Sequence, residues 1–410
     1  MLPKGWKQVP LHTVAEVRTG LSKNARREGA TLKRPYLRVA NVQDGALDLS
    51  DVQEIDVPAS QMPRYTLQSG DLLLIEGNGN PENLGRGCLW RGQIPEAVHQ
   101  NHVFAVRTHT NGPLLPEFLE LQVQSPYGRG YFLSCAKGST GLSSLNSTQL
   151  KSFPVILPSY EEQCRIARVI YTWDAAITTT EKLLTNSRKQ KQALIQHLLF
   201  QSEAQVDKYC LSDISERVKR DSDGDEHPIL MISSGSGFVQ QNQKYSRFMA
   251  GKSLNDYILL KRGEFAYNKG NSKLYEFGCV FPLENYDTGL VPHVYVCFQL
   301  DERCHPDYFK FLFEADYLHD QLGALVNTGV RNNGLLNIRP ADFMNVTVPV
   351  PPLARQEYIA DVLMAASEQA RLLQEDLDAL RLQKRVLLAD LLTGKRRVRV
   401  ANSMAEPEAA

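Results

Sequence analysis

The sequence is informative first for what it lacks. It contains no apolar run near the roughly 20 residues of a membrane-spanning helix, and its first residues, Met-Leu-Pro-Lys-Gly-Trp, do not have the pattern of a signal peptide. Its 7 cysteines include no Cys-x-x-Cys pair, which disfavours a zinc site and a disulfide framework. We therefore expect a cytoplasmic protein that makes no contact with a membrane.

Neither sign of charge is in excess. Lysine and arginine together number 46, as do aspartate and glutamate, so the formal net charge is zero. This balance excludes nucleic-acid binding through bulk positive charge, but it allows a local basic face.

Motifs for catalysis and for cofactors are also missing. No Asp or Glu stands two residues before a Lys, so the usual local half of a metal-dependent nuclease site is absent. A Gly-Lys-Ser triplet begins at Gly251, yet Ser246 stands where a phosphate-binding loop requires glycine. His99 and His102 are not accompanied by a carboxylate or cysteine set that would complete a metal site. The sequence predicts a non-catalytic protein with no cofactor and no metal of its own.

What the sequence does contain is an internal repeat. Residues 158–199 recur at 351–392, an offset of 193, with no gap between the copies. The matched residues include two polar pairs, Gln163 with Gln356 and Gln190 with Gln383, which helix formation alone does not require. A repeat of this length indicates one structural unit built twice.

Each copy of the repeat has apolar residues spaced alternately by four and three positions. That spacing keeps one seam of a helix facing a partner helix. Each copy is about 40 residues, or about 60 Å of helix at about 1.5 Å per residue. We expect two long helices packed side by side, antiparallel by preference. The seam residues are Ile166, Ile170, Trp173, Ile177, Leu184, Leu194 and Leu198 in the first helix, and Ile359, Leu363, Ala366, Ala370, Leu373, Leu377, Leu380, Leu387 and Leu391 in the second.

Segments ahead of each helix repeat more loosely. Leu67, Gly70, Gly77 and Asn78 match Leu260, Gly263, Gly270 and Asn271 at an offset of 193. At an offset of 191, Gly87, Cys88, His102 and Val103 match Gly278, Cys279, His293 and Val294. Between the matches, apolar runs predict short strands, such as Leu72–Ile75, Val103–Val106 and Val294–Phe298, with helices around Phe118–Gln124 and Tyr308–Phe313. Two similar domains of mixed α and β structure are expected.

Four segments resemble a known family. They are Pro35–Val42, Leu67–Leu74, Leu157–Gln163 and Leu391–Lys395, and with the duplication they resemble the DNA-specificity subunits of type I restriction-modification systems. The resemblance implies an α+β fold in which two long antiparallel, coiled-coil-like spacer helices separate two target-recognition domains. The expected ranges are 1–155 for the first recognition domain, 156–201 for the first spacer helix, 202–349 for the second domain, 350–398 for the second helix and 399–410 for a disordered tail.

The same resemblance implies a function. Such a subunit is a non-catalytic reader of a bipartite, asymmetric site on double-stranded DNA. It joins two methylating (M) subunits, which bind S-adenosylmethionine, and a motor-nuclease (R) subunit. Two alternatives stay open from the residues alone: the specificity subunit of another methyltransferase-nuclease system, and a helical protein scaffold that binds no DNA. The recognised bases and the length of the spacer between half-sites cannot be predicted from the sequence.

Polar residues at matching places in the two frameworks are the candidates for DNA contact. Arg and Asn suit the reading of base edges, whereas Lys and Ser more often hold phosphate. Partner subunits are expected on the helices around Ile166, Trp173, Leu194, Ile359, Leu373 and Leu387. Lys395, Arg396, Arg397 and Arg399 either touch phosphates or form a solvated basic end. Arg38, Tyr245 and Arg247 are weaker candidates. The DNA-binding candidates are Asn78, Asn80, Arg86, Lys137, Ser139, Thr140, Lys269, Asn271, Lys273, Arg331, Asn332 and Asn333.

Overall fold

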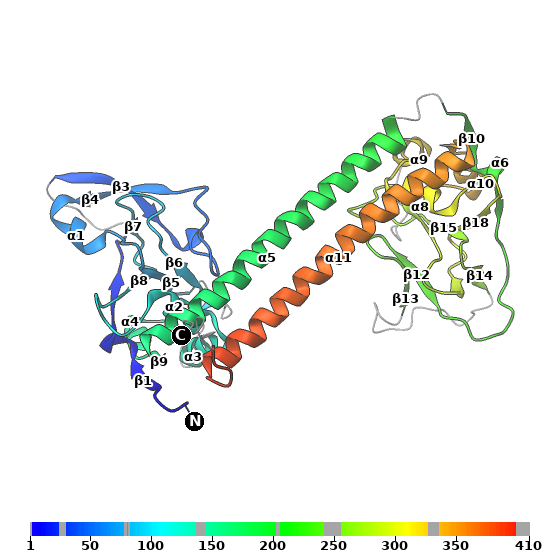
Figure 1. Cartoon of the computed structure of the whole chain (residues 1–410). Helices are drawn as coiled ribbons and strands as arrows, with labels where there is room; N and C mark the ends of the chain where they lie inside the picture. Colours follow the sequence, from blue (N-terminus) through cyan, green and yellow to red (C-terminus); the bar gives the residue numbers. More distant parts are fainter. Residues whose placement is uncertain are drawn as a thin grey trace, which may run out of the picture. The chain divides into compact units, whose positions relative to one another are not determined.

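A computed structural model describes residues 2–23, 30–77, 80, 83–136, 144–201, 206–241, 256–326 and 336–398. These residues form two compact units. Unit 1 comprises Met1–Glu181 and Glu375–Ala410, and unit 2 comprises Lys182–Gln374. Both boundaries fall inside long helices, so each unit contains part of both helices (Figure 1).

Unit 1 is built on a four-stranded antiparallel sheet with the strand order β2-β8-β5-β6. A second sheet has the order β4-β3-β7, and β1 pairs with β9. The strands are β1 (Lys7–Pro10), β2 (Ala15–Thr19), β3 (Thr31–Leu37), β4 (Gln53–Pro58), β5 (Leu72–Ile75), β6 (Gly87–Leu89), β7 (Val98–His99), β8 (Val103–Thr108) and β9 (Pro154–Leu157). The helices are α1 (Met62–Tyr65), α2 (Pro116–Gln124), α3 (Pro126–Ala136) and α4 (Ser147–Lys151), with 3-10 turns at Leu11–Thr13, Val39–Asn41 and Ala59–Gln61.

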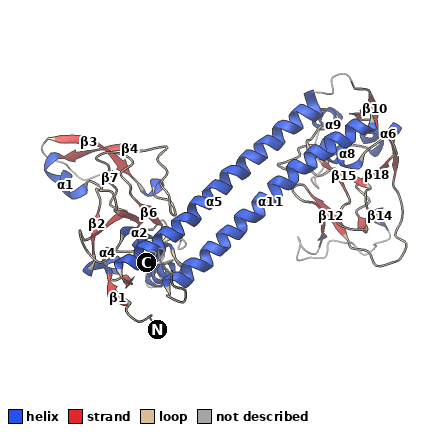
Figure 2. Ribbon diagram, viewed as in Figure 1, coloured by secondary structure: helices blue, strands red, loops and turns tan. Residues whose placement is uncertain are grey.

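The four-stranded sheet of unit 1 is buried on both faces, which explains the continuous Leu-Leu-Leu-Ile sequence of β5. Side chains of a strand point alternately to opposite faces. Leu72 and Leu74 lie in one core together with α2, while Leu73 and Ile75 lie in a second core on the other face. Figure 2 shows the strands and helices that build these layers.

Unit 2 repeats this framework. Its four-stranded sheet has the order β11-β18-β15-β16, and β10 pairs with β19 as β1 pairs with β9. The strands are β10 (Lys208–Cys210), β11 (Ser215–Arg217), β12 (Leu230–Ser233), β13 (Gly237–Gln240), β14 (Ile258–Lys261), β15 (Phe265–Asn268), β16 (Cys279–Pro282), β17 (Thr288–Val291), β18 (Val296–Leu300) and β19 (Thr347–Pro349). The helices are α6 (Leu211–Ile214), α8 (Pro306–Glu314), α9 (His319–Leu325) and α10 (Pro340–Met344).

The predicted elements of the framework are confirmed. The expected strands coincide with β5, β8 and β18, and the expected helices coincide with α2 and α8. Both of these helices begin with a proline, Pro116 and Pro306, whose fixed φ angle suits the first turn of a helix. The units differ outside the framework, where unit 1 has the β4-β3-β7 sheet and unit 2 has the pairs β12-β13 and β14-β17.

One detail of the predicted repeat is wrong. The amide of Trp90 donates to the Asp71 carbonyl, as the amide of Leu283 donates to the Glu264 carbonyl. The offset is therefore still 193 at this point, and Cys88 corresponds to Phe281 rather than to Cys279. In β8 and β18 the offset is 192, because Phe104 pairs with Leu74 as Val296 pairs with Tyr267. Between β5 and β8 the offset changes only after β6, and the same holds between β15 and β18 after β16, so the matched Gly-Cys pairs were a coincidence.

The two long helices are α5 (Tyr160–Ile195), which a π-helical turn at Gln196–Gln201 extends, and α11 (Leu353–Leu392). In unit 1, Asp174 of α5 pairs with Lys384 of α11, and Glu181 pairs with Arg381 at 2.8 Å. The numbering rises along α5 while it falls along α11, so the predicted antiparallel pairing is confirmed (Figure 1). In unit 2, Arg188 of α5 donates to Gln374 of α11 at 3.0 Å. All predicted seam residues are buried or half-buried.

Two glutamines attach the long helices to the globular parts. The Gln163 side chain accepts from the Leu115 amide at 2.9 Å and donates to the Pro113 and Pro158 carbonyls. Gln356 makes the same three contacts in unit 2, with His305, Arg303 and Pro351. Both side chains are fully buried, so their amides replace water for backbone groups that would otherwise be unsatisfied.

The first and last described segments of the chain meet in unit 1. α11 ends at Leu392 and Gly394 adopts a left-handed φ of 68°, as expected for a glycine cap. Arg397 then pairs with buried Glu162 at 2.5 Å, and the Trp6 indole donates to the same carboxylate at 3.2 Å. Lys395 and Arg396 lie 3.6 and 4.0 Å from Asp390. Basic residues 395–397 thus contact acidic groups of their own chain, whereas Arg399 lies outside the described residues.

Candidate nucleic-acid interface

The loops that leave the central sheet of unit 1 converge at the end of β5. The Glu76 amide donates to the His102 carbonyl at 3.0 Å, and the Leu145 amide donates to the Glu76 carbonyl at 2.7 Å. The Glu76 carboxylate also holds the His102 ring, with 2.7 Å between Oε2 and Nδ1. Segments from three distant parts of the sequence therefore meet at the end of β5. Asn80, which follows Glu76 by four residues, is exposed.

Arg86 lies at the same end of the sheet, directly before β6. Its Nη2 is 3.5 Å from the Val39 carbonyl, which is a long contact. Its Nε is buried and, among the described residues, has no hydrogen-bond partner. Arg86 is therefore only weakly fixed by its own unit, but its Nε is inaccessible, so a base edge or a phosphate would have to meet the Nη atoms.

Unit 2 has the corresponding site at the end of β15. The Leu336 amide donates to the Lys269 carbonyl at 3.1 Å, which repeats the contact between Leu145 and Glu76. Asn271 and Lys273 are exposed there, and Lys269 is half-buried. The two sites differ in charge at matching positions, because Glu76 corresponds to Lys269 and Asn80 corresponds to Lys273 at the offset of 193.

Of the candidates, the structure describes Asn80 and Arg86 in unit 1, in two successive backbone turns linked through Asn83, and Lys269, Asn271 and Lys273 in unit 2, where they follow β15 along the chain. Arg38, a weaker candidate, pairs with Asp51 at 2.8 Å and so has a structural role. The remaining candidates lie outside the described residues. They are Asn78, Lys137, Ser139, Thr140, Tyr245, Arg247, Arg331, Asn332 and Asn333.

Comparison with known proteins shows which sequences resemble this chain. Residues 3–186 match the family model described as type I restriction modification DNA specificity domain. The chain is 31% identical to the EcoKI type I specificity subunit of Escherichia coli, over 45% of this chain and 39% of that protein. It is 23% identical to the putative MjaX type I specificity subunit of Methanocaldococcus jannaschii, over 97% of this chain and 95% of that protein.

Residues 3–186 therefore carry a type I restriction modification DNA specificity domain, and the chain is similar to the specificity subunits of such systems.

A solved structure is similar in fold over almost the whole of this chain. It is the HsdS subunit from Thermoanaerobacter tengcongensis, with a TM-score of 0.51 and 15% identity, over 96% of this chain and 98% of that chain. Alignment with the E. coli relative, by contrast, covers less than half of that protein's length. The predicted fold class is confirmed.

The helix residues predicted to bind partners mostly stabilise the fold of the chain itself. Ile166 and Ile359 are buried in the cores of units 1 and 2, and Leu387 and Leu194 pack against those cores. Trp173 and Leu373 are half-buried on the seam. Any partner of these helices therefore meets their other faces, where Leu382 and Val386 are 59% and 53% exposed.

Sequence reasoning did not foresee the pairing of His102 with Glu76, because the two residues are 26 positions apart and meet only through strand pairing. His99 is buried, its Nδ1 lies 2.7 Å from the Val103 carbonyl, and burial lowers its pKa to about 4. In the part of the chain that the structure describes, no group of His, Cys, Asp or Glu could hold a metal ion, and no helix is long and apolar enough to cross a membrane.

Proposed function

We propose that this chain is the specificity subunit of a type I restriction-modification system, that is, its non-catalytic DNA-recognition component. Each unit reads one half of a bipartite, asymmetric site on double-stranded DNA. The observation that carries the proposal is one framework built twice, with different polar side chains at the matching ends of β5 and β15. Equivalent placement suits two half-sites, and different side chains suit two different half-site sequences.

The zero net charge of the chain suggests that its partners supply part of the contacts to the DNA phosphates. A chain without excess cations releases few counterions from DNA, so tight binding needs phosphate contacts from elsewhere. We propose that two methylating (M) subunits supply them, that these subunits carry the S-adenosylmethionine, and that a motor-nuclease (R) subunit joins for restriction. The exposed faces of α5 and α11 are the surfaces proposed for these partners. The cytoplasm is the proposed location.

The test is to map methylated sequences in a host that expresses the specificity subunit with its methylating partner. The expected result is a motif of two unlike half-sites separated by a fixed number of unread bases. Asn271→Ala should then relax the second half-site alone, with Asn186→Ala, an exposed asparagine of α5 in the same unit, as the control. A continuous motif, or no motif, would contradict the proposal.

A further inference from the structure

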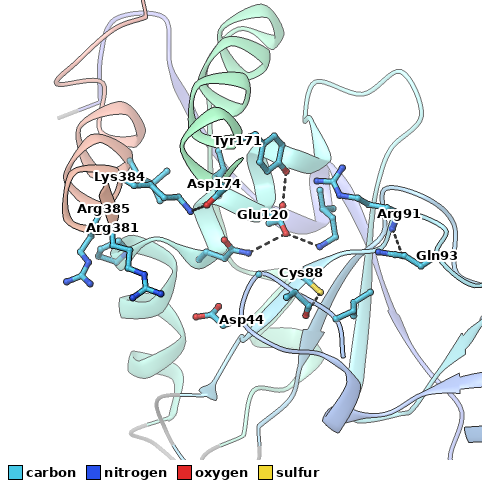
Figure 3. Close-up of a pocket in the computed structure, with 18 residues that line it drawn as sticks. Asp44, Cys88, Arg91, Gln93, Glu120, Tyr171, Asp174, Arg381, Lys384 and Arg385 are labelled. Atoms are coloured by element: carbon cyan, nitrogen blue, oxygen red, sulfur yellow. Dashed lines mark hydrogen bonds and ion pairs between the residues drawn. The ribbon is translucent and has the colours of Figure 1, made fainter. Parts of the chain in front are cut away.

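A polar pocket of about 580 Å³ lies in unit 1 between the sheet and the two long helices. Figure 3 shows Arg381, Lys384 and Arg385 of α11 on one side, Arg91 on the other side, and Glu120 of α2 between them. Nothing in the proposed reading of DNA uses this pocket.

The acidic residues of the pocket already have partners. Glu120 is buried and accepts hydrogen bonds from the Leu89 amide at 2.9 Å and the Tyr171 hydroxyl at 2.8 Å. Asp174 pairs with Lys384, and Asp44 pairs with Arg129. These carboxylates are therefore not available to bind a cation.

The cations of the pocket are not all matched. Arg381 pairs with Glu181 at 2.8 Å, but Arg385, one helical turn later, has no hydrogen-bond or ion-pair partner among the described residues. The guanidinium of Arg91 lies 5.4 Å from the centroid of the Tyr171 ring and interacts electrostatically with Glu120, but it forms no hydrogen bond or ion pair within the same described set. Like charges one turn apart repel each other, and a bound anion would remove that repulsion.

Unit 2 has a pocket of about 470 Å³ at the equivalent place, and no arginine is among the described residues that line that pocket. Glu284 corresponds to Arg91 and Lys310 corresponds to Glu120, and these two residues pair with each other at 2.7 Å. The inversion has a physical reason: Leu89 donates its amide to Glu120, whereas the corresponding Pro282 has no amide hydrogen. The position of Arg385 is occupied by Gln192 at the offset of 193.

We propose that the pocket of unit 1 binds the carboxylates of a short acidic segment of a protein partner, held by Arg385 and Arg91. Guanidinium groups form strong, directional hydrogen bonds with carboxylates. Duplex DNA suits the pocket poorly, because its phosphates are spread along the duplex whereas the cations here are confined to one pocket of about 580 Å³. The site goes beyond the proposed function, since it requires no DNA, and it belongs to unit 1 alone.

The test uses the full chain and a fluorescein-labelled peptide of four glutamates, followed by fluorescence anisotropy. The native chain should bind this peptide and not a peptide of four glutamines. Arg385→Gln, which installs the unit 2 residue, should weaken binding about tenfold, as expected for one lost charge-assisted hydrogen bond. The matched control is Lys189→Gln, an exposed cation of α5 that does not line the pocket, and it should leave binding unchanged.

Each outcome decides the proposal. Absence of peptide binding, or equal binding by the native chain and Arg385→Gln, overturns it. Displacement of the peptide by a random-sequence duplex at low concentration also overturns it, in favour of a nucleic-acid site, whereas displacement by free glutamate supports it. The methylated DNA motif of Arg385→Gln should be unchanged, so failure of this site is distinguishable from failure of DNA reading.

Discussion

Gln163 and Gln356 are the residues through which each long helix is tied to a globular part. Gln163→Ala would leave the Leu115 amide and two carbonyls without partners in a buried place. One unsatisfied buried group costs about 1–3 kcal/mol, so we expect at least that loss in the free energy of unfolding of unit 1.

All three tryptophans, Trp6, Trp90 and Trp173, lie in unit 1, so urea unfolding followed by tryptophan fluorescence reports on that unit. The midpoint should fall for Gln163→Ala and stay unchanged for Gln190→Ala, a glutamine of the same helix that is exposed. Equal effects of the two substitutions would mean that the buried contacts of Gln163 are not stabilising.

Glu120 gives unit 1 a pH dependence. Burial raises the pKa of Glu120 above 4.5, although the hydrogen bond from Tyr171 opposes this. The folded state then binds the proton more tightly than the unfolded state, so the contribution of Glu120 is fully present below pH 4.5 and declines as the pH rises through the folded-state pKa. Relative to the native chain, Glu120→Gln should therefore gain thermal stability as the pH is raised from 5 to 8. A constant difference across that range would show that Glu120 does not titrate there.

At the scale of elements, the seam between the long helices contains one poorly satisfied residue. Ser187 is buried, and its hydroxyl has no hydrogen-bond partner among the described residues. Removing an unsatisfied buried hydroxyl removes its desolvation cost, so Ser187→Ala should raise the free energy of unfolding of unit 2 by about 1 kcal/mol. Ser367→Ala is the control, because Ser367 donates to the Leu363 carbonyl at 2.7 Å. Far-UV circular dichroism during urea unfolding measures both, and a loss of stability in Ser187→Ala would contradict the prediction.

The elements also show what could be predicted from the sequence. The helices and the strands β5 and β8 were predictable because their apolar spacing is local. The pairings β1 with β9 and β10 with β19 were not, since each joins segments about 140 residues apart and no local pattern sets their register. The same limit applied to Arg397, whose partner Glu162 is 235 positions away. For the candidate interface, the repeated framework gave matching positions after β5 and β15, whose contact with DNA stays a prediction, and the pairing of Glu76 with His102 depended on tertiary contacts.

For the whole molecule, α5 and α11 are the elements that join the two units, and both begin in one unit and end in the other. A heptad inserted into both helices, next to Arg188 and Gln374, keeps the seam in phase and adds about 10 Å at about 1.5 Å per residue. The methylated motif should retain both half-sites and gain at most about three base pairs of spacing, at about 3.4 Å per pair. Two inserted residues instead would rotate the seam out of register and should abolish assembly. Half-sites that change identity in the heptad variant would show that the helices do not set the spacing.

The meeting of the chain ends has a mechanical consequence. Gly394 approaches Pro3 so closely that a Cβ atom at Gly394 would lie 2.1 Å from the proline ring, and Arg397 and Trp6 share the Glu162 carboxylate. If residues 2 and 398 were pulled apart, this junction would carry the load first, and the whole of unit 2 would form an unloaded loop until the junction broke. A single-molecule force trace should therefore begin with the opening of unit 1, and Glu162→Ala should lower the force of that first event while the force at which unit 2 opens stays the same.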